Sequence, residues 1–549
     1  MSLELKYKIG FPSLYYPKIS LADRIDAAAE KFGEKTAIIS AEPKFPSEFP
    51  ESMNFLEICE VTKKLASGIS RKGVRKGEHV GVCIPNSIDY VMTIYALWRV
   101  AATPVPINPM YKSFELEHIL NDSEATTLVV HSMLYENFKP VLEKTGVERV
   151  FVVGGEVNSL SEVMDSGSED FENVKVNPEE DVALIPYTGG TTGMPKGVML
   201  THFNLAANAL QLAVATGLSH MDTIVGCMPM FHSAEFGLVN LMVTVGNEYV
   251  VMGMFNQEML AENIEKYKGT FSWAVPPALN VLVNTLESSN KTYDWSYLKV
   301  FATGAWPVAP ALVEKLLKLA AEKCNNPRLR HNQIWGMTEA CPMVTTNPPL
   351  RLDKSTTQGV PMSDIELKVI SLEDGRELGV GESGEIVIRG PNIFKGYWKR
   401  EKENQECWWY DEKGRKFFRT GDVGFIDEEG FLHFQDRVKE VIKYKGYTIA
   451  PFELEALLMK HEAVMDVAVI GKPDEEAGEV PKAFIVLKPE YRGKVDEEDI
   501  IEWVRERISG YKRVREVEFV EELPRTASGK LLRRLLREKE AEGHHHHHH

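Results

Sequence analysis

Apolar positions along the chain follow two periods, and together they predict both helices and strands. Between Ser20 and Phe32 apolar residues fall on one helical face, with Ser20 as the expected N-cap and Gly33 as the stop. His79–Ile84 is a short apolar run typical of a buried strand, and Ser87–Val100 is expected to follow it as a helix. This alternation continues for some 300 residues and predicts a mainly parallel α/β sheet.

The pattern changes near residue 359, where short strands separated by Gly-rich turns replace the alternation. A smaller β-rich subdomain is therefore expected there. Beyond Asp436 a helix is predicted at Phe452–Met459 and strands at Val464–Ile470 and Lys482–Leu487, which indicates a separate α+β domain. We therefore predict a large N-terminal domain over residues 1–436, made of two βα-type subdomains and the β-rich subdomain. A small mobile domain is expected over residues 437–543, and residues 544–549 are a histidine tag.

Composition narrows the function classes. At 549 residues the chain is too long for one core, and 44% hydrophobic with 26% charged residues is ordinary for a globular protein. A net charge of −17 argues against nucleic acid as a partner. The six cysteines lack a C-x-x-C spacing, the first nine residues lack the apolar core of a secretory signal, and no apolar run reaches the length of a membrane span. These features predict a soluble cytoplasmic protein and leave an oligomer open.

One stretch, Tyr187–Val198, concentrates four glycines, three threonines and a lysine in twelve residues. Glycines let a loop bring backbone N–H groups close to an anion, while threonine hydroxyls add donors and Lys196 adds a positive charge. The spacing matches neither the P-loop nor the dinucleotide-binding pattern. The stretch is predicted to hold phosphate, and its candidate contacts are Thr188, Gly189, Gly190, Thr191, Thr192, Gly193 and Lys196.

Four further stretches accompany this loop: Trp335–Glu339, Arg419–Asp422, Arg437–Lys439 with Lys443–Gly446, and Pro524–Arg534. In this order and spacing the set resembles the adenylate-forming superfamily, which includes acyl-CoA synthetases, 4-coumarate-CoA ligases, firefly luciferases and peptide-synthetase adenylation domains. The resemblance covers residues 20 to 540. It implies two half-reactions: a carboxylate and ATP give acyl-AMP and pyrophosphate, and a thiol, usually that of coenzyme A, then displaces AMP.

The resemblance also implies roles for the nucleotide-binding residues. Asp422 matches the carboxylate that binds both ribose hydroxyls, and Trp335 matches an aromatic position, usually tyrosine, that packs against adenine. Thr338 and Glu339 match contacts to phosphate and Mg²⁺. The remaining implied contacts are Gly304 and Ala305 across the adenine, Gly336 and Met337 beside Trp335, and Thr191 as a second Mg²⁺ contact.

The C-terminal motifs imply a moving domain. Lys530 matches the lysine that contacts the substrate carboxylate and the α-phosphate, where an ammonium group stabilises the transition state. Arg437 resembles a nucleotide contact, and Lys439 occupies the hinge position. In the family the small domain rotates between half-reactions, which would exchange the Lys530 face for the face that carries Lys443–Gly446 and forms the thiol tunnel.

The acyl pocket is less sharply defined by sequence. The resemblance places its walls at Met230–Ser233 and the following helix, Ala274–Pro277, Gly304 and Gly336–Met343. His232 is a candidate to gate this pocket, and a histidine that only caps the helix is the alternative. His232 stands where peptide-synthetase domains carry an aspartate for an amine, and Glu235 lies three residues on. The apolar, Met-containing lining favours an acyl chain, whereas large side chains such as Trp306 would shorten the cavity.

These features predict an ATP- and Mg²⁺-dependent carboxylic acid–CoA ligase acting on a medium- or long-chain fatty acid. An aryl-CoA ligase of the 4-coumarate or benzoate type is the alternative within that class. Transfer of the acyl group to a carrier protein, a luciferase-like oxygenase, and a binding module without turnover also remain open. The last would be expected to lack Lys530 or Glu339, and both are present.

Overall fold

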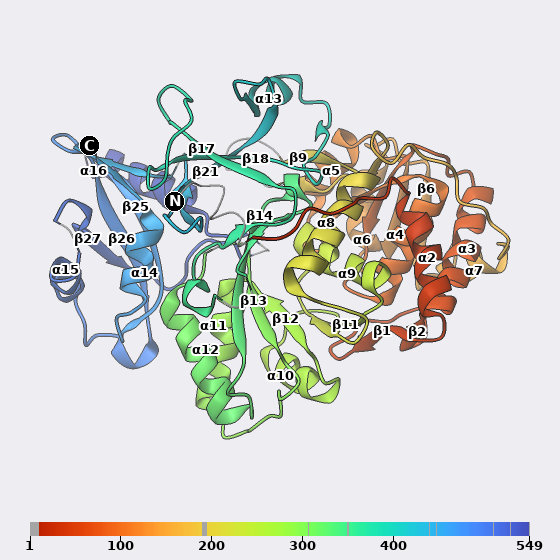
Figure 1. Cartoon of the computed structure of the whole chain (residues 1–549), viewed down its shortest axis with the longest axis horizontal. Coiled ribbons are helices and arrows are strands. Elements are labelled where there is room, and N and C mark those ends of the chain that lie inside the picture. The colour runs from red at the N-terminus through yellow and green to blue at the C-terminus, as the bar shows by residue number, and fades with distance from the viewer. Residues whose placement is uncertain are drawn as a thin grey trace.

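The computed structural model describes residues 10–188, 195–305, 307–348, 351–438, 440–445, 447–508, 510–526 and 529–547. In Figure 1 the chain forms a large body of sheets flanked by helices, and the C-terminal residues form a smaller unit beside it. The two parts meet around β14 (Arg330–Gly336) and the β-rich subdomain. This arrangement confirms the predicted fold class, a large α/β domain followed by a small α+β domain.

The largest sheet has nine strands in the order β16-β15-β14-β13-β12-β10-β11-β1-β2. Its pairs from β14 to β1 are parallel, whereas β2, β15 and β16 pair antiparallel at its two ends. The strands β1 and β2 come from the start of the chain, so the first subdomain is built into a sheet formed mainly by residues 223–361. The bounds are β1 Thr36–Ala41, β2 Ser52–Asn54, β10 Thr223–Gly226, β11 Glu248–Met252, β12 Phe271–Ala274, β13 Val300–Thr303, β15 Met343–Thr346 and β16 Val360–Pro361.

A second sheet of four parallel strands has the order β4-β3-β5-β6. Parallel pairing requires crossover connections, and helices supply them on this sheet as the alternating pattern predicts. The strands are β3 His79–Cys83, β4 Thr103–Pro106, β5 Thr127–His131 and β6 Arg149–Val153.

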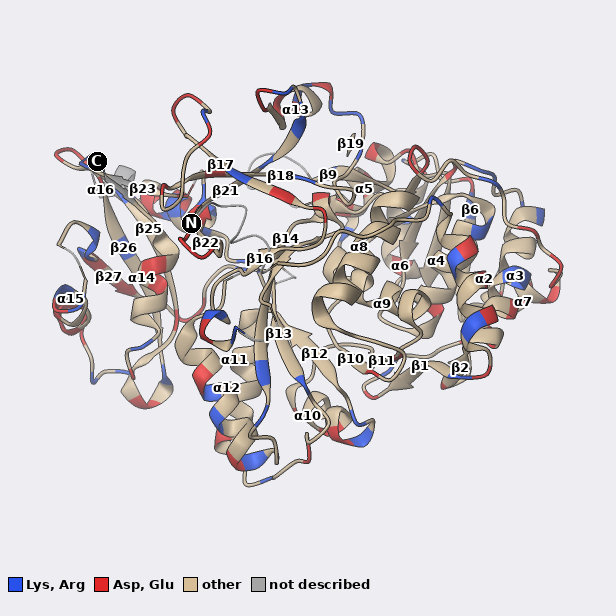
Figure 2. Ribbon diagram, in the orientation of Figure 1, with Lys and Arg blue, Asp and Glu red and all other residues tan. Residues whose placement is uncertain are grey.

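Helices pack against these sheets through buried apolar faces. In α2 the Ser20 side chain accepts a hydrogen bond from Asp23 N, and the chain leaves the helix at Gly33 with a positive φ of 53°, as predicted. The helices of the large domain are α2 Leu21–Phe32, α3 Phe55–Arg71, α4 Ile88–Val100, α5 Ser113–Asp122, α6 Tyr135–Leu142, α7 Leu160–Asp165, α8 His202–Thr216, α9 Ser233–Val245, α10 Gln257–Lys266, α11 Pro276–Ser288, α12 Pro310–Lys323 and α13 Glu401–Glu406. Figure 2 shows charged residues on the outward helices α10 and α12, whereas the ribbons of α8 and α9 are almost entirely uncharged.

Two smaller sheets complete the large domain. One joins β9 to β7, β8 and β19, and the other has the order β17-β18-β21-β20 with β22 added on β21. Their bounds are β7 Val182–Leu184, β8 Tyr187–Thr188, β9 Lys196–Thr201, β19 Gly396–Tyr397, β17 Glu366–Ile370, β18 Gly384–Arg389, β20 Trp408–Tyr410, β21 Lys416–Ile426 and β22 Leu432–Arg437. The second sheet is the predicted β-rich subdomain.

The C-terminal residues have a sheet and a hydrophobic core of their own. The sheet has the order β24-β23-β26-β25 with β27 added on β26, and its core includes Ile442, Leu454, Val469 and Ile485. The elements are β23 Ile442–Tyr444, β24 Tyr447–Ile449, β25 Val464–Asp474, β26 Gly478–Leu487, β27 Glu516–Phe519, α14 Pro451–Leu458, α15 Glu497–Arg505 and α16 Arg533–His547. The proposed boundary after Asp436 lies near the end of β22 and stays a prediction.

One predicted strand is shorter than expected for a reason that bears on the site. The pattern predicts a strand over Thr223–Met230, but β10 ends at Gly226. The Asn86 side chain donates to the carbonyl of Met228 and accepts from Met230 N, each at 2.7 Å, and so holds this segment as a loop. The loop leads directly into α9. Among the described residues no helix is long and apolar enough to cross a membrane.

Candidate active site

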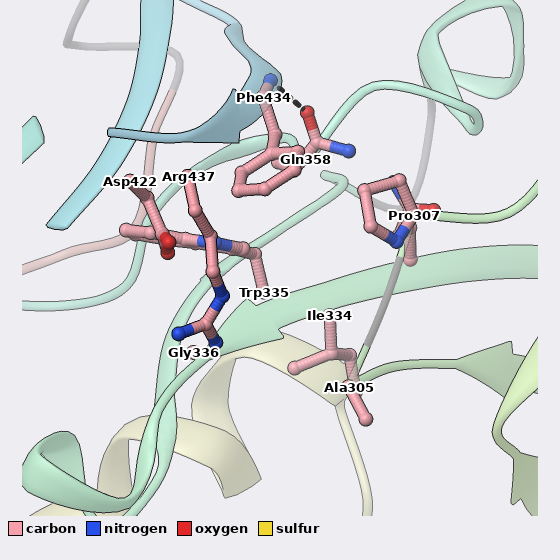
Figure 3. A pocket seen from close by; sticks show the side chains of 10 residues that line it. Ala305, Pro307, Ile334, Trp335, Gly336, Gln358, Asp422, Phe434 and Arg437 are labelled. Carbon is pink, nitrogen blue, oxygen red and sulfur yellow. Dashed lines mark hydrogen bonds between the residues drawn. The ribbon is translucent and has the colours of Figure 1, made fainter. Parts of the chain in front are cut away.

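A pocket lies where β14 and the loop after β13 meet the β21–β22 ladder. Figure 3 shows the side chains of Trp335, Asp422 and Arg437 converging in it. On the opposite side lie Ala305, Pro307 and Ile334. Its lining residues are Ala305, Pro307, Gln333, Ile334, Trp335, Gly336, Gln358, Asp422, Phe434 and Arg437. The sequence motifs around Trp335 and Asp422 are therefore brought together, although almost ninety residues separate them.

The backbone at the end of β14 is unusually close to its neighbours. The pairing with β15 is irregular between Trp335 and Gly336, and a Cβ at Gly336 would lie 1.8 Å from the carbonyl oxygen of Pro342. Only glycine fits this approach. Across the pocket, Ala305 has a positive φ of 71°, in the left-handed region that non-glycine residues rarely adopt. These two backbone features shape a narrow slot between Trp335 and the loop after β13.

Asp422 is buried in β21 directly opposite Arg437 of β22. Burial raises the pKa of the Asp422 carboxyl, while Arg437, Lys530 and a hydrogen bond from Trp335 act in the opposite direction. The Trp335 indole therefore has two roles: its ring lines the pocket, and its N–H donates a hydrogen bond to Asp422. Among the described residues the Arg437 Nε atom finds no hydrogen-bond partner, so a ligand oxygen could satisfy this donor.

The described ends of the Gly/Thr-rich loop form a short antiparallel ladder. Tyr187 of β8 pairs with Gly197 of β9, and Thr188 pairs with Lys196. Side chains brace this base: the Tyr187 hydroxyl donates to Asp122 at 2.6 Å, and His118 Nε2 lies 2.9 Å from the Pro195 carbonyl oxygen. The candidate contacts Gly189, Gly190, Thr191, Thr192 and Gly193 lie outside the described residues.

Thr338 and Glu339 lie in a short 3-10 turn that follows β14. The Tyr397 hydroxyl donates to a Glu339 carboxylate oxygen at 2.6 Å, and the Lys196 ammonium lies 4.2 Å from the centre of the Tyr397 ring. Tyr397 therefore connects the lysine of the Gly/Thr-rich loop to the candidate metal-binding carboxylate. Sequence reasoning missed this tyrosine, since the aromatic run Phe394–Trp398 gives no signal of its partner.

Lys530 lies on a tight turn of the C-terminal unit, near Asp422 and Arg437 of the pocket. Its backbone N–H donates to Thr526 Oγ1 at 3.0 Å, and Arg525 braces the turn by donating to the Gly529 carbonyl oxygen at 3.0 Å. Gly529 has a positive φ of 87°, and a Cβ there would lie 3.0 Å from Val275 of the large domain. The turn is therefore packed against the segment predicted to line the acyl pocket.

The surroundings of Lys530 come from both parts of the chain. Burial and the positive charge of Arg437 lower its pKa to about 7, against the attraction of Asp422, Glu440 and Glu339. Lys530 in turn affects His232, because burial and then the lysine charge lower the His232 pKa to about 4. His232 is therefore neutral at pH 7, and its Nδ1 accepts from Ala234 N at 3.3 Å as the N-cap of α9.

An ion cluster fixes the C-terminal unit in this position. Arg533, three residues beyond Lys530, is fully buried and contacts Asp436 at 3.0 Å and Glu440 at 2.6 Å. It also pairs with Glu455 of α14. Asp436 belongs to β22 of the large domain, so the cluster joins the two parts of the chain beside the lysine turn.

Comparison with known proteins agrees with this geometry. The family model of AMP-binding enzymes matches residues 25–398, and that of the AMP-binding enzyme C-terminal domain matches residues 453–530. The chain belongs to the AMP-binding enzyme family. It is an AMP-forming acyl-CoA synthetase of this family, as the motifs predicted.

Three relatives represent the range of similarity. A crystal structure of a long-chain-fatty-acid-CoA ligase from Archaeoglobus fulgidus is 94% identical, with a TM-score of 0.78 over 94% of this chain and 99% of that one. A probable 4-coumarate-CoA ligase of Dictyostelium discoideum is 34% identical over 88% of this chain and 89% of the relative. A long-chain-fatty-acid-CoA ligase of Bacillus subtilis is 30% identical, covering 96% of each.

AMP-binding ligases of this kind use ATP and coenzyme A. The pocket that holds Trp335, Asp422 and Arg437 has the donors and the flat surface that a nucleoside requires. Among the described residues no group of three His, Cys, Asp or Glu side chains could hold a metal ion. One oxygen of the Glu339 carboxylate accepts a hydrogen bond from Tyr397. A single carboxylate of this kind fits Mg²⁺ that is bound mainly through substrate phosphates.

The described residues of the predicted thiol tunnel lie in the β23–β24 hairpin of the C-terminal sheet. Lys443 belongs to β23, where the neighbouring Tyr444 pairs with Gly478, and Lys445 N donates to the Ala477 carbonyl oxygen at 2.8 Å. These contacts are made within the C-terminal sheet. Lys439 and Gly446 lie outside the described residues, so their predicted roles stay predictions.

Proposed function

We propose that this enzyme joins a medium- or long-chain fatty acid to coenzyme A through an acyl-AMP intermediate. The observation that carries the proposal is the position of Lys530, which the C-terminal unit brings beside Asp422, Arg437 and Glu339 of the large domain. A lysine buried among these groups, next to the pocket lined by Trp335, Asp422 and Arg437, suits adenylation better than simple binding.

In the proposed complex with ATP, Trp335 packs against adenine, and the loop at Gly304 and Ala305 closes the other face. Asp422 accepts hydrogen bonds from both ribose hydroxyls, and Arg437 donates to the nucleotide. Thr188, Lys196 and the loop between them hold the β- and γ-phosphates, and Thr338 contacts the α-phosphate. Glu339, with Thr191 as a second contact, would hold Mg²⁺, which when bound neutralises phosphate charge.

In the first half-reaction a carboxylate oxygen of the acid attacks the α-phosphorus. The bond to the oxygen that bridges to the β-phosphorus breaks, and pyrophosphate leaves with the electron pair. Negative charge grows on the α-phosphate oxygens at the transition state, where the Lys530 ammonium stabilises it. Neutral His232 borders the reacting carboxylate without adding positive charge.

In the second half-reaction the sulfur of coenzyme A attacks the acyl carbon, the thiol proton goes to solvent, and AMP leaves. We propose that the C-terminal domain turns about Lys439 before this step, which removes Lys530 and presents Lys443–Gly446 to the thiol. The arrangement described here, with Lys530 buried near Asp422 and Arg437, suits adenylation.

The fatty-acid assignment is supported by the apolar surroundings of α9 and by the names of the A. fulgidus and B. subtilis relatives. An aryl acid is the second candidate, supported by the 4-coumarate-CoA ligase relative. The carrier-protein acceptor and the cytoplasmic location stay predictions.

Pyrophosphate release over a panel of acids tests the assignment. Hexanoate, octanoate, decanoate and palmitate are compared with benzoate and 4-coumarate, each with ATP and Mg²⁺, with and without coenzyme A. We expect release with the fatty acids and full turnover to AMP only with coenzyme A. Release with the aromatic acids alone would replace the fatty-acid assignment by the aryl one, and no release with any acid would contradict the proposed function.

A further inference from the structure

Strand β19 is only two residues long, but the chain around it contacts two of the candidate motifs. The strand pairs with β9, where Tyr397 lies opposite Val198, two residues beyond Lys196 of the Gly/Thr-rich loop. In the same segment Phe394 N donates to the Glu339 carbonyl oxygen at 2.8 Å. The segment is therefore fixed both to the strand that carries the candidate phosphate lysine and to the turn that carries the candidate metal carboxylate.

The Tyr397 side chain makes the same two connections through different parts of one residue. Its hydroxyl donates to Glu339 Oε2 at 2.6 Å, and the Lys196 ammonium lies 4.2 Å from the centre of its ring. At that distance the ammonium is attracted to the electron-rich face of the ring. Tyr397 thus contacts a positive group through its ring and a negative group through its hydroxyl.

The surroundings of Tyr397 hold its ring in this position. Only 4% of the residue is exposed, and the Phe394 ring packs edge-on against it with the ring centres 4.8 Å apart. Asn404 of α13 fixes its backbone, since Tyr397 N donates to Asn404 Oδ1 at 2.7 Å and Asn404 Nδ2 donates to the Tyr397 carbonyl oxygen at 2.8 Å. Groups arranged before a ligand arrives need no ordering when it binds, which favours binding.

We propose that Tyr397 is a positioning residue for ATP: its hydroxyl orients the Glu339 carboxylate toward Mg²⁺, and its ring places the Lys196 ammonium for the β- and γ-phosphates. This role rests on the proposed function, which gives Glu339 the metal and Lys196 the phosphates. The hydroxyl engages Oε2, so Oε1 is the oxygen that meets the metal. Outer partners of this kind fix the orientation of a metal-binding side chain.

Equilibrium binding of ATP in the absence of an acid tests the hydroxyl. The measured quantity is the ratio of the ATP Kd in EDTA to the ATP Kd in excess Mg²⁺, both from calorimetric titration. Tyr397→Phe keeps the ring and loses the hydroxyl, so it should lower this ratio by about tenfold, as loss of an outer partner of a metal ligand does. It should leave the Kd in EDTA unchanged. Glu339→Gln, which removes the carboxylate charge, should lower the ratio at least as much.

Tyr16→Phe is the matched control, since the Tyr16 hydroxyl also donates to a carboxylate, that of Asp364, at 2.6 Å. Neither residue of this pair lines the pocket of Trp335 and Asp422. The control should therefore keep the wild-type ratio. A Tyr397→Phe protein with the wild-type ratio, next to a lowered ratio in Glu339→Gln, would overturn the role of the hydroxyl.

A double-mutant cycle with Lys196 tests the ring. Tyr397→Leu removes the ring together with the hydroxyl, so it should weaken ATP binding in EDTA by about threefold or more. In the Lys196→Ala background the same change should have no further effect on that Kd, because the two side chains act as one unit. Equal weakening in both backgrounds would overturn the role of the ring.

Failure of the proposed function gives a different pattern. Since no acid is present, the choice between a fatty and an aryl substrate does not enter these measurements. If Glu339→Gln keeps the wild-type ratio, Glu339 is not the metal contact, which contradicts the proposed function and removes the role of the hydroxyl with it. The cycle with Lys196 still decides the role of the ring in that case.

Discussion

At the scale of single residues, the surroundings of Lys530 change the pH range over which its side chain is charged. A solvated lysine is charged throughout the neutral range, but burial and Arg437 lower the pKa of Lys530 to about 7. The charged form exists below that pH and is lost above it. Because adenylation as proposed needs the ammonium, the free enzyme should lose competence as the pH rises.

We therefore expect kcat/KM for ATP in pyrophosphate release to fall as pH rises through about 7, approaching tenfold per pH unit, since this parameter reports the free enzyme. Lys530→Arg, which keeps its charge to much higher pH, should lack this fall in whatever activity it retains. A wild-type profile that stays flat over the range from about pH 6 to 9 would contradict the assignment.

Individual site residues were predictable where a local motif identifies them. Trp335, Asp422 and Arg437 were named from sequence, and all three line one pocket. Lys530, also named from sequence, lies close enough to Asp422 and Arg437 for their charges to shift its pKa. Tyr397 was not predicted. Its contacts arise from pairing between strands far apart in the chain, which no local pattern records.

At the scale of elements, the end of β14 shows how backbone packing shapes the nucleotide pocket. Gly336 lies against the Pro342 carbonyl, and Met337 N donates to that same oxygen at 2.8 Å. Any side chain at residue 336 would push the strand away from the turn that carries Thr338 and Glu339.

Gly336→Ala should lower the free energy of unfolding by about 3 kcal/mol, because backbone atoms cannot yield as a flexible side chain can. Urea unfolding of the purified variant measures this. Gly146→Ala is the control, since a Cβ there meets nothing within 4 Å, and it should change stability by less than about 0.5 kcal/mol. Equal stability of the two variants would show that the close approach at Gly336 does not constrain the strand.

Elements were predicted well where the signal is local. The cap at Ser20 and the stop at Gly33 define α2 correctly, because both act through neighbouring backbone groups. The predicted end of β10 was wrong by several residues. Asn86, far back in the chain, forms hydrogen bonds with the backbone of Met228 and Met230 and so keeps this segment out of the strand. The parallel pairing of β1 with β11 was not predictable either, because the two strands lie far apart in the chain and no local pattern records their contact.

At the scale of the whole molecule, the account depends on two parts that meet at one site. The large domain supplies the nucleotide pocket, and the C-terminal unit supplies Lys530 on a turn packed against Val275. Arg533 connects the same unit to Asp436 of β22. The sequence predicted both parts and the lysine, but which face of the C-terminal unit would meet the pocket was not predictable, since both faces carry motifs.

The central claim is that Lys530 serves adenylation only, and separate assays of the two half-reactions of Lys530→Ala test it most directly. Pyrophosphate release from ATP and the acid should fall by a factor of about 100 to 1000, as expected for loss of a transition-state donor. Acyl-CoA formation from supplied acyl-AMP should stay within about twofold of wild type, and Lys460→Ala, at an exposed lysine of the same unit, should leave both steps unchanged. Equal loss of both half-reactions in Lys530→Ala would contradict the account.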